Sequence, residues 1–157
     1  MDAQGALKET TMTIPEFNLR CIRCEEEAEA RPDRYVCPRC GGNCEVVYPN
    51  ARLARTGIAP HGGIERFAGV LPVAVASLPP IPIGPTPLYR RDDLAQRHGV
   101  ARLEIKDDGR LPSCSFKDRA SAVALARARD VQARELCTAS TGNAAAAQAC
   151  MGAAAGF

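Results

Sequence analysis

The chain has 157 residues, with 20 Lys and Arg against 18 Asp and Glu, and a net charge of +2. This near-balanced charge gives no electrostatic reason to expect nucleic acid or a membrane as a partner. Because Trp is absent and aromatic residues make up only 4% of the chain, the core must be built from Ala, Val, Leu and Ile.

The first segment, residues 1–17, is polar with little periodicity and is expected to be a flexible lead-in. It lacks the basic start and apolar run of a secretory signal. No apolar run in the chain reaches the length needed to span a membrane. These features predict a cytoplasmic protein.

Residues 18–48 contain two C-x-x-C pairs separated by twelve residues, followed by a further cysteine, Cys44. Disulfides are disfavoured in a reducing cytosol, whereas four thiolates suit a tetrahedral zinc ion. Gly41 and Gly42 allow a tight turn that directs N–H groups at sulfur. A redox dithiol pair and incidental cysteines are the alternatives, but the spacing favours a small zinc ribbon with structural Zn²⁺. Cys44 is interpreted as a non-ligand, and the predicted ligands are Cys21, Cys24, Cys37 and Cys40.

Residues 49–88 are rich in Gly and Pro, which disfavours regular helix or a central strand and predicts a connector. An α/β domain is expected to begin at residue 89. Its first elements are a short helix in DDLAQRHG, with an acidic start and a Gly stop, and a strand in ARLEIKDD.

The rest of the chain alternates between helix and strand. Residues 118–135 predict a helix and residues 136–139 a short apolar strand. An Ala-rich helix is expected at 143–155, with Asn143 as its cap and Gly156 as its stop. This alternation is typical of a parallel α/β sheet. Cys137 and Cys150 are expected to fill its core.

Lys117 stands at the start of a predicted helix, in the segment Ser115–Arg119. The positive end of the helix dipole, together with burial, would disfavour the ammonium form and lower the pKa of the amine. A neutral amine is what a lysine needs to form a Schiff base with an aldehyde cofactor. A solvated surface lysine is the alternative.

The tetrapeptide Ser140-Thr141-Gly142-Asn143 lies between the predicted strand and the Ala-rich helix. Hydroxyl groups, free N–H groups and the helix dipole at such a turn favour binding of a carboxylate or phosphate. The turn also lies where α/β sheets bind their ligands, at the carboxyl end of a strand. A simple turn followed by a helix cap is the alternative.

Taken in order, the double C-x-x-C ribbon, TPL at 86–88, KDDG at 106–109, SFKDR at 115–119 and STGN at 140–143 resemble the N-terminal part of the threonine synthase family. The resemblance spans roughly residues 18–157. These are pyridoxal 5′-phosphate enzymes of fold type II, so it implies a zinc ribbon followed by the beginning of a parallel α/β sheet.

The resemblance also implies roles for individual residues. Lys117 would hold pyridoxal 5′-phosphate and later shuttle protons, Phe116 would pack near the cofactor, and Asn143 would hydrogen-bond the oxygen on the cofactor ring. Ser140, Thr141 and Gly142 would bind the substrate carboxylate. Asp118 and Arg119 would orient the start of the helix.

The implied reaction converts O-phospho-L-homoserine and water to L-threonine and phosphate, as a carbon–oxygen lyase acting on phosphates in threonine biosynthesis. The small-molecule partner is thus a phosphorylated amino acid, and the full-length enzyme would be a homodimer. Because Pro82-Ile83-Gly84-Pro85 before Thr86 departs from the family's pattern, cysteate synthase and amino-acid dehydratase activities stay open. A zinc-ribbon binding module with a degenerate enzyme remnant is a further alternative.

The family's glycine-rich loop for the cofactor phosphate, and its partner for the pyridine nitrogen, come later in the family's chain than residue 157. We therefore expect this chain to be an N-terminal fragment that is inactive alone.

Overall fold

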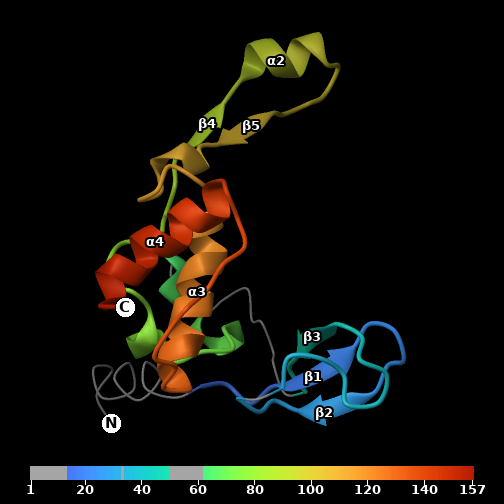
Figure 1. Ribbon diagram of the computed structural model, residues 1–157. Coiled ribbons are helices and arrows are strands. Elements are labelled where there is room, and N and C mark those ends of the chain that lie inside the picture. The colour runs from blue at the N-terminus through green and yellow to red at the C-terminus, as the bar shows by residue number, and fades with distance from the viewer. Residues whose placement is uncertain (1–13, 33, 50–61) are drawn as a thin grey trace, which may run out of the picture.

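A computed structural model describes residues 14–32, 34–49 and 62–157 of the chain. A small β-ribbon lies at one side, two packed helices form the centre, and a hairpin with a short helix extends at the far end (Figure 1). None of the described helices is long and apolar enough to cross a membrane.

The β-ribbon is a three-stranded antiparallel sheet. Its strands are β1 (Asn18–Cys21), β2 (Glu27–Glu29) and β3 (Cys44–Val47), in the order β2-β1-β3. The register places Cys21 opposite Cys44 and Arg20 opposite Glu45. The Arg20 guanidinium donates a hydrogen bond of 2.9 Å from Nε to Glu45 Oε1, as expected for opposite charges on facing strands.

The extension at the far end is a hairpin built from β4 (Leu88–Arg90) and β5 (Glu104–Lys106), which pair antiparallel. Helix α2 (Asp92–Arg97) lies between them, with two acidic residues in its first turn. The short helix predicted in DDLAQRHG and the strand predicted in ARLEIKDD are therefore confirmed.

The centre consists of α3 (Lys117–Asp130) and α4 (Asn143–Ala155), which pack against each other. Small buried side chains on both helices permit this close approach. Leu125 and Met151 are fully buried in the shared core. The small buried residues are Ala122, Ala126, Ala147 and Gly152.

The observed helix boundaries differ from the predicted ones at two points. Helix α3 ends five residues before 135, because Gln132 adopts a left-handed backbone with φ of +56°. The N-cap of α4 is Gly142 rather than Asn143, and no side chain caps it. The predicted stop at Gly156 is confirmed, since its φ of +79° suits a glycine that ends a helix.

The parallel sheet is the main correction. All strand pairs among the described residues are antiparallel, and residues 136–139 form no strand. The strand predicted near Ile105 pairs with β4 instead, and no other described strand lies beside residues 136–139 for them to pair with. Leu136 and Cys137 are consequently exposed, so Cys137 does not fill the core, whereas Cys150 packs partly buried against it.

The described part of the predicted connector, residues 62–88, contains only 3₁₀ helices before β4. These are η1 (Ile64–Val70) and η2 (Val75–Ser77). Its buried apolar residues Ile64, Leu71, Val73 and Ile83 belong to the same core as α3 and α4. Asp130, at the end of α3, accepts hydrogen bonds from the Ala74 N–H at 3.2 Å and from the Ser77 hydroxyl. The segment therefore covers the helix pair and is held to it.

Replacing Leu125 with Ala should lower the free energy of unfolding by about 2–5 kcal/mol, because it opens a cavity in a fully buried position. The matched change Leu136→Ala, at a side chain that is 40% exposed, should cost less than about 1 kcal/mol. Urea unfolding followed by circular dichroism measures both. Equal losses for the two variants would contradict the core described above.

Candidate functional site

Lys117 is the first residue of α3, where the sequence placed it. Its backbone N–H donates to Ser115 Oγ at 3.3 Å, and its side chain is half-buried. The amine Nζ lies 4.8 Å from the centroid of the Phe116 ring, which is 59% exposed. The amine is thus held beside an accessible aromatic face at the start of a helix.

Asp118 shapes the turn that leads into Lys117. Its side chain is fully buried and accepts hydrogen bonds from the Ser113 N–H at 2.7 Å and from the Ser113 hydroxyl. A buried carboxylate needs such partners to offset its lost hydration. The interaction closes residues 113–118 into a turn at the start of the helix.

Arg119 joins three segments that are far apart in the chain. Its Nη2 donates to Asp108 Oδ1 at 2.9 Å and to Thr86 Oγ1 at 3.2 Å, and Thr86 Oγ1 donates to Asp108 Oδ1 at 2.6 Å. The hydrogen bond from Arg119, followed by that from Thr86, lowers the pKa of the Asp108 carboxyl. Three sequence motifs, TPL, KDDG and SFKDR, therefore meet at one polar cluster beside Lys117.

The STGN segment leads into α4. The Ser140 hydroxyl accepts a 3.3 Å hydrogen bond from the Gly142 N–H, and Thr141, Gly142 and Asn143 are exposed. Because no side chain caps this helix, N–H groups of its first turn are available to an anion. Helices α3 and α4 begin at the same end of the helix pair, so STGN and Lys117 both lie at that end (Figure 1).

The residues at this end fit the chemistry of pyridoxal phosphate. A reachable amine can bond its aldehyde, an exposed aromatic ring can pack against it, and uncapped N–H groups can bind a carboxylate. The sequence patterns located Lys117 and STGN. They assigned no contacts to Thr86, Asp108 or Ser113, because no local pattern reveals a side-chain pair separated by up to 33 residues.

The second candidate site is a cysteine cluster in the β-ribbon. The sulfur atoms of the four predicted ligands lie within 4.8 Å of one another. Two of the sulfur pairs, Cys21–Cys40 and Cys24–Cys37, are 3.5 Å and 3.6 Å apart. Tetrahedral zinc with Zn–S bonds of about 2.3 Å requires sulfur separations of roughly 3.8 Å, so the donor set fits a metal ion.

The two C-x-x-C turns repeat one hydrogen-bond pattern. The Arg23 N–H donates to Cys21 Sγ at 3.4 Å, and the Arg39 N–H donates to Cys37 Sγ at the same distance. The N–H of the residue four positions after each of these cysteines donates to that cysteine's carbonyl oxygen, at 3.0 Å in both turns. For Cys21, burial acts to raise the thiol pKa, but hydrogen bonds from the N–H groups of Arg23 and Cys24 and from the thiols of Cys40 and Cys24 outweigh it and lower the pKa, which favours the thiolate.

Gly42 leaves space for the sulfurs. A Cβ atom added there would lie 3.1 Å from Cys21 Sγ and 3.3 Å from Cys40 Sγ, tighter than ordinary contacts. The preceding Gly41 has a φ of +68°, and Glu25 occupies the equivalent position of the first turn at +58°. Both turns thus require one residue in the left-handed backbone conformation. Gly41 adopts this conformation at a lower cost than Glu25, because glycine has no Cβ atom.

Cys44 lies outside the cluster, as expected. Its thiol faces the Gly42 carbonyl oxygen at 3.9 Å. Burial, followed by the charges of Cys21, Cys37 and Cys40, raises its pKa, so this thiol stays protonated. Among described residues 14–32 and 34–49, only Cys21 and Cys37 are buried. The described part of the ribbon therefore has no hydrophobic core of its own apart from its cysteines.

Comparison with known proteins identifies a family whose match includes both helix starts. Residues 80–157 match the family described as pyridoxal-phosphate dependent enzyme, and this part of the chain includes Lys117 and STGN. This part of the chain, from residue 80 onwards, belongs to that family.

Its relatives include several threonine synthases. The chain is 34% identical to that of Methanosarcina acetivorans over 149 residues, which are 90% of this chain and 35% of the relative. Identity to the Methanocaldococcus jannaschii threonine synthase is 33%, over 83% of this chain and 33% of the relative. Identity to the Halalkalibacterium halodurans threonine synthase is 38%, over 62% of this chain and 27% of the relative. The chain thus spans about a third of the length of the first two, and no solved structure matches it.

Replacing Asp108 with Asn should remove a pH-dependent part of the stability. Because the folded pKa is lowered, the carboxylate's contribution is complete above the pKa of an unfolded aspartate, about 4, and is lost as pH falls through the folded pKa. At pH 7 the variant should be about 1 kcal/mol less stable than the wild type, and the difference should shrink towards pH 2. Asp92→Asn, at an exposed ion pair with Arg90, is the control and should change little. A pH-independent loss in D108N would contradict this account.

Proposed function

We propose that this chain is the part of a threonine synthase that carries the cofactor lysine. The enzyme would convert O-phospho-L-homoserine and water to L-threonine and phosphate. The observation that carries the proposal is Lys117, held at the start of α3 with its amine beside the exposed Phe116 ring. The similarity to threonine synthases over most of the chain supports this choice of substrate.

In this proposal Lys117 is both tether and base. Its amine would hold pyridoxal phosphate covalently, and Phe116 would pack against the ring. When bound, the cofactor supplies an electron sink that makes hydrogens on the substrate carbons acidic. Once the substrate amine has displaced Lys117 from that covalent bond, the freed Nζ atom would accept those protons and return them as phosphate leaves the γ carbon and water adds at the β carbon.

The start of α4 would bind the substrate. Ser140, Thr141 and Gly142 would hold its carboxylate with hydroxyl and N–H donors, favoured by the positive end of the helix dipole. Asn143 would hydrogen-bond the oxygen on the cofactor ring. These groups and Lys117 lie at one end of the packed helix pair, so a single small molecule would contact both (Figure 1).

Lys117 also needs a fixed position to transfer protons over a short distance. The hydrogen bond between Ser113 and Asp118 holds the turn before Lys117 in place. Arg119 connects the helix start to Asp108, just after β5, and to Thr86 in the connector. Asp118 and Arg119 are thus positioning residues in this proposal.

We further propose that the cysteine cluster binds a structural zinc ion. Four sulfur donors leave no open coordination position for a substrate, so the metal would stabilise the ribbon and take no part in the reaction. It would replace the hydrophobic core that the ribbon lacks.

Cys37→Ser should lower the zinc content from about one ion per chain to near zero after dialysis against a weak chelator, since it removes one of four ligands. Cys44→Ser is the matched control and should keep its zinc. Atomic emission spectroscopy measures the content. Equal zinc in both variants would show that the cluster is not the metal site.

The role of Lys117 in holding the cofactor can be tested by comparison with the other described lysine, Lys106. After incubation with pyridoxal phosphate and reduction with borohydride, mass spectrometry should locate the label on Lys117. Lys117→Ala should abolish that label, whereas Lys106→Ala, in β5, should retain it. Labelling that persists undiminished in K117A would overturn the assigned role.

The substrate is tested in the longer enzyme that includes this chain. O-phospho-L-homoserine should yield threonine and phosphate in equal amounts, and K117A should reduce the rate by several orders of magnitude. Phosphate release from O-phosphoserine with sulfite, but not from O-phospho-L-homoserine, would instead indicate cysteate synthesis.

A further inference from the structure

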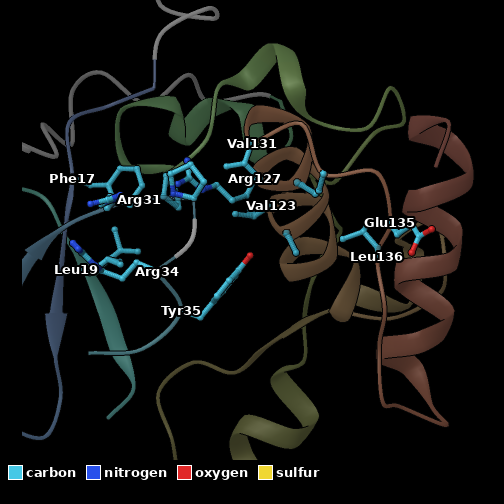
Figure 2. A pocket seen from close by; sticks show the side chains of 17 residues that line it. Phe17, Leu19, Arg31, Arg34, Tyr35, Val123, Arg127, Val131, Glu135 and Leu136 are labelled. Carbon is cyan, nitrogen blue, oxygen red and sulfur yellow. The ribbon is translucent and has the colours of Figure 1, made fainter. Parts of the chain in front are cut away.

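A cleft separates the β-ribbon from helix α3, away from the starts of α3 and α4. It has a volume of about 400 Å³ and is lined on one side by ribbon residues and on the other by α3 and the segment that follows it. Figure 2 shows Phe17 and Leu19 on the ribbon side, Val123 on α3, and Tyr35 pointing its hydroxyl across the cleft towards α3. We refer to it as the ribbon cleft.

Both walls of the ribbon cleft are held in place. The Tyr48 hydroxyl donates a 2.6 Å hydrogen bond to the Val70 carbonyl oxygen, linking the end of the ribbon to η1. The Phe17 and Tyr48 rings are 6.1 Å apart, and the guanidinium carbon of Arg127 lies 5.8 Å from the Phe17 centroid. Contacts from two separate elements thus fix the ribbon against the body of the protein.

The lining combines an apolar surface with positive charge. Among the described lining residues, three are arginines and one, Glu135, carries a carboxylate; Figure 2 places Glu135 beside Leu136 at the far end from Phe17. Within the described ranges, neither Arg34 nor Arg127 forms an ion pair, although the Arg34 guanidinium donates to the Glu29 carbonyl oxygen. Arg127 extends from α3 towards Phe17, so its charge lies near the apolar ribbon wall (Figure 2).

We propose that the ribbon cleft binds a small organic anion: a carboxylate or phosphate group on an apolar body. The volume lies within the range of about 300–1,000 Å³ typical of small-molecule sites. The oxyanion would meet the guanidinium of Arg127, which is suited to two-point hydrogen bonding, and the apolar body would lie between Phe17 and Val123. This ligand site is separate from the one proposed at Lys117.

Nuclear magnetic resonance titration of the whole chain tests the proposal with three probes. These are 3-phenylpropionate, phenyl phosphate and the neutral control 3-phenylpropanamide. At least one anion should shift the resonances of Phe17 and Val123 with saturation, and the amide should bind at least roughly tenfold more weakly, since it lacks the charge. Which anion binds more tightly distinguishes a carboxylate from a phosphate ligand.

Arg127→Gln should weaken binding of the preferred anion at least roughly tenfold. Arg97→Gln is the matched control, because Arg97 is likewise an arginine in the last turn of a helix but lies on α2. Circular dichroism shows whether R127Q is folded. If it is not, Val123→Trp, which would fill the cleft from its apolar wall without adding a charge, replaces it and should weaken binding to a similar extent.

Each of the following results would overturn the proposal: no saturable shift with either anion, equal binding of the amide, equal affinity in R127Q and R97Q, or shifts confined to Lys117 and STGN. The proposal would also be overturned if, without any probe, the resonances of the ribbon cleft broadened as the protein concentration rose. That result would show that a second copy of the chain occupies the cleft. Because the readout is binding at Phe17 and Val123, failure here leaves the labelling test of Lys117 unaffected.

Discussion

The ion pair between Arg119 and Asp108, with Thr86 bonded to both, is the interaction on which the arrangement at the helix starts depends. It connects the first turn of α3 to the residues just before β4 and just after β5. Both side chains are only about a quarter to a third exposed, so water and salt screen the pair less than a surface pair. Without it, the hairpin would have few ties to the helix that carries Lys117.

The Asp118 interaction acts at shorter range on the same helix start. Arg119 holds segments distant in sequence, whereas Asp118 holds the turn immediately before Lys117. Of these two consecutive residues of the SFKDR motif, Asp118 therefore forms local hydrogen bonds and Arg119 forms long-range ones. In its proposed role of proton transfer Lys117 would gain from both, because neither its backbone nor its neighbouring segments could shift independently.

The two parts of the molecule are stabilised by different physics. The helix pair buries aliphatic side chains, with Leu125, Val73 and Met151 fully enclosed. The β-ribbon is too small to do this, and its buried residues are cysteines whose sulfurs point at one another. With the proposed zinc ion bound, the stability of the ribbon would therefore depend on the metal and on chelators. The ribbon cleft lies where these two parts meet.

The sequence by itself determined the features whose cause is local. The C-x-x-C spacing and the adjoining glycines specify the cysteine turns, and the acidic start and glycine stop specify α2. The Ala-rich run specifies α4, and Gly156 specifies its end. The position of Lys117 at a helix start followed from the same kind of signal. These depend on residues within one or two turns of each other, which a pattern contains in full.

Only the tertiary structure decided the features that depend on residues far apart in the chain. The alternation of helix and strand predicted a parallel sheet, yet β5 pairs antiparallel with β4 and residues 136–139 have no described strand beside them. The Arg119 cluster, the covering of α3 by the connector and the ribbon cleft likewise arise from contacts between separate segments. The physical reason is that strand pairing and side-chain bonding are set by which surfaces meet on folding, and local propensity contains no information about the partner.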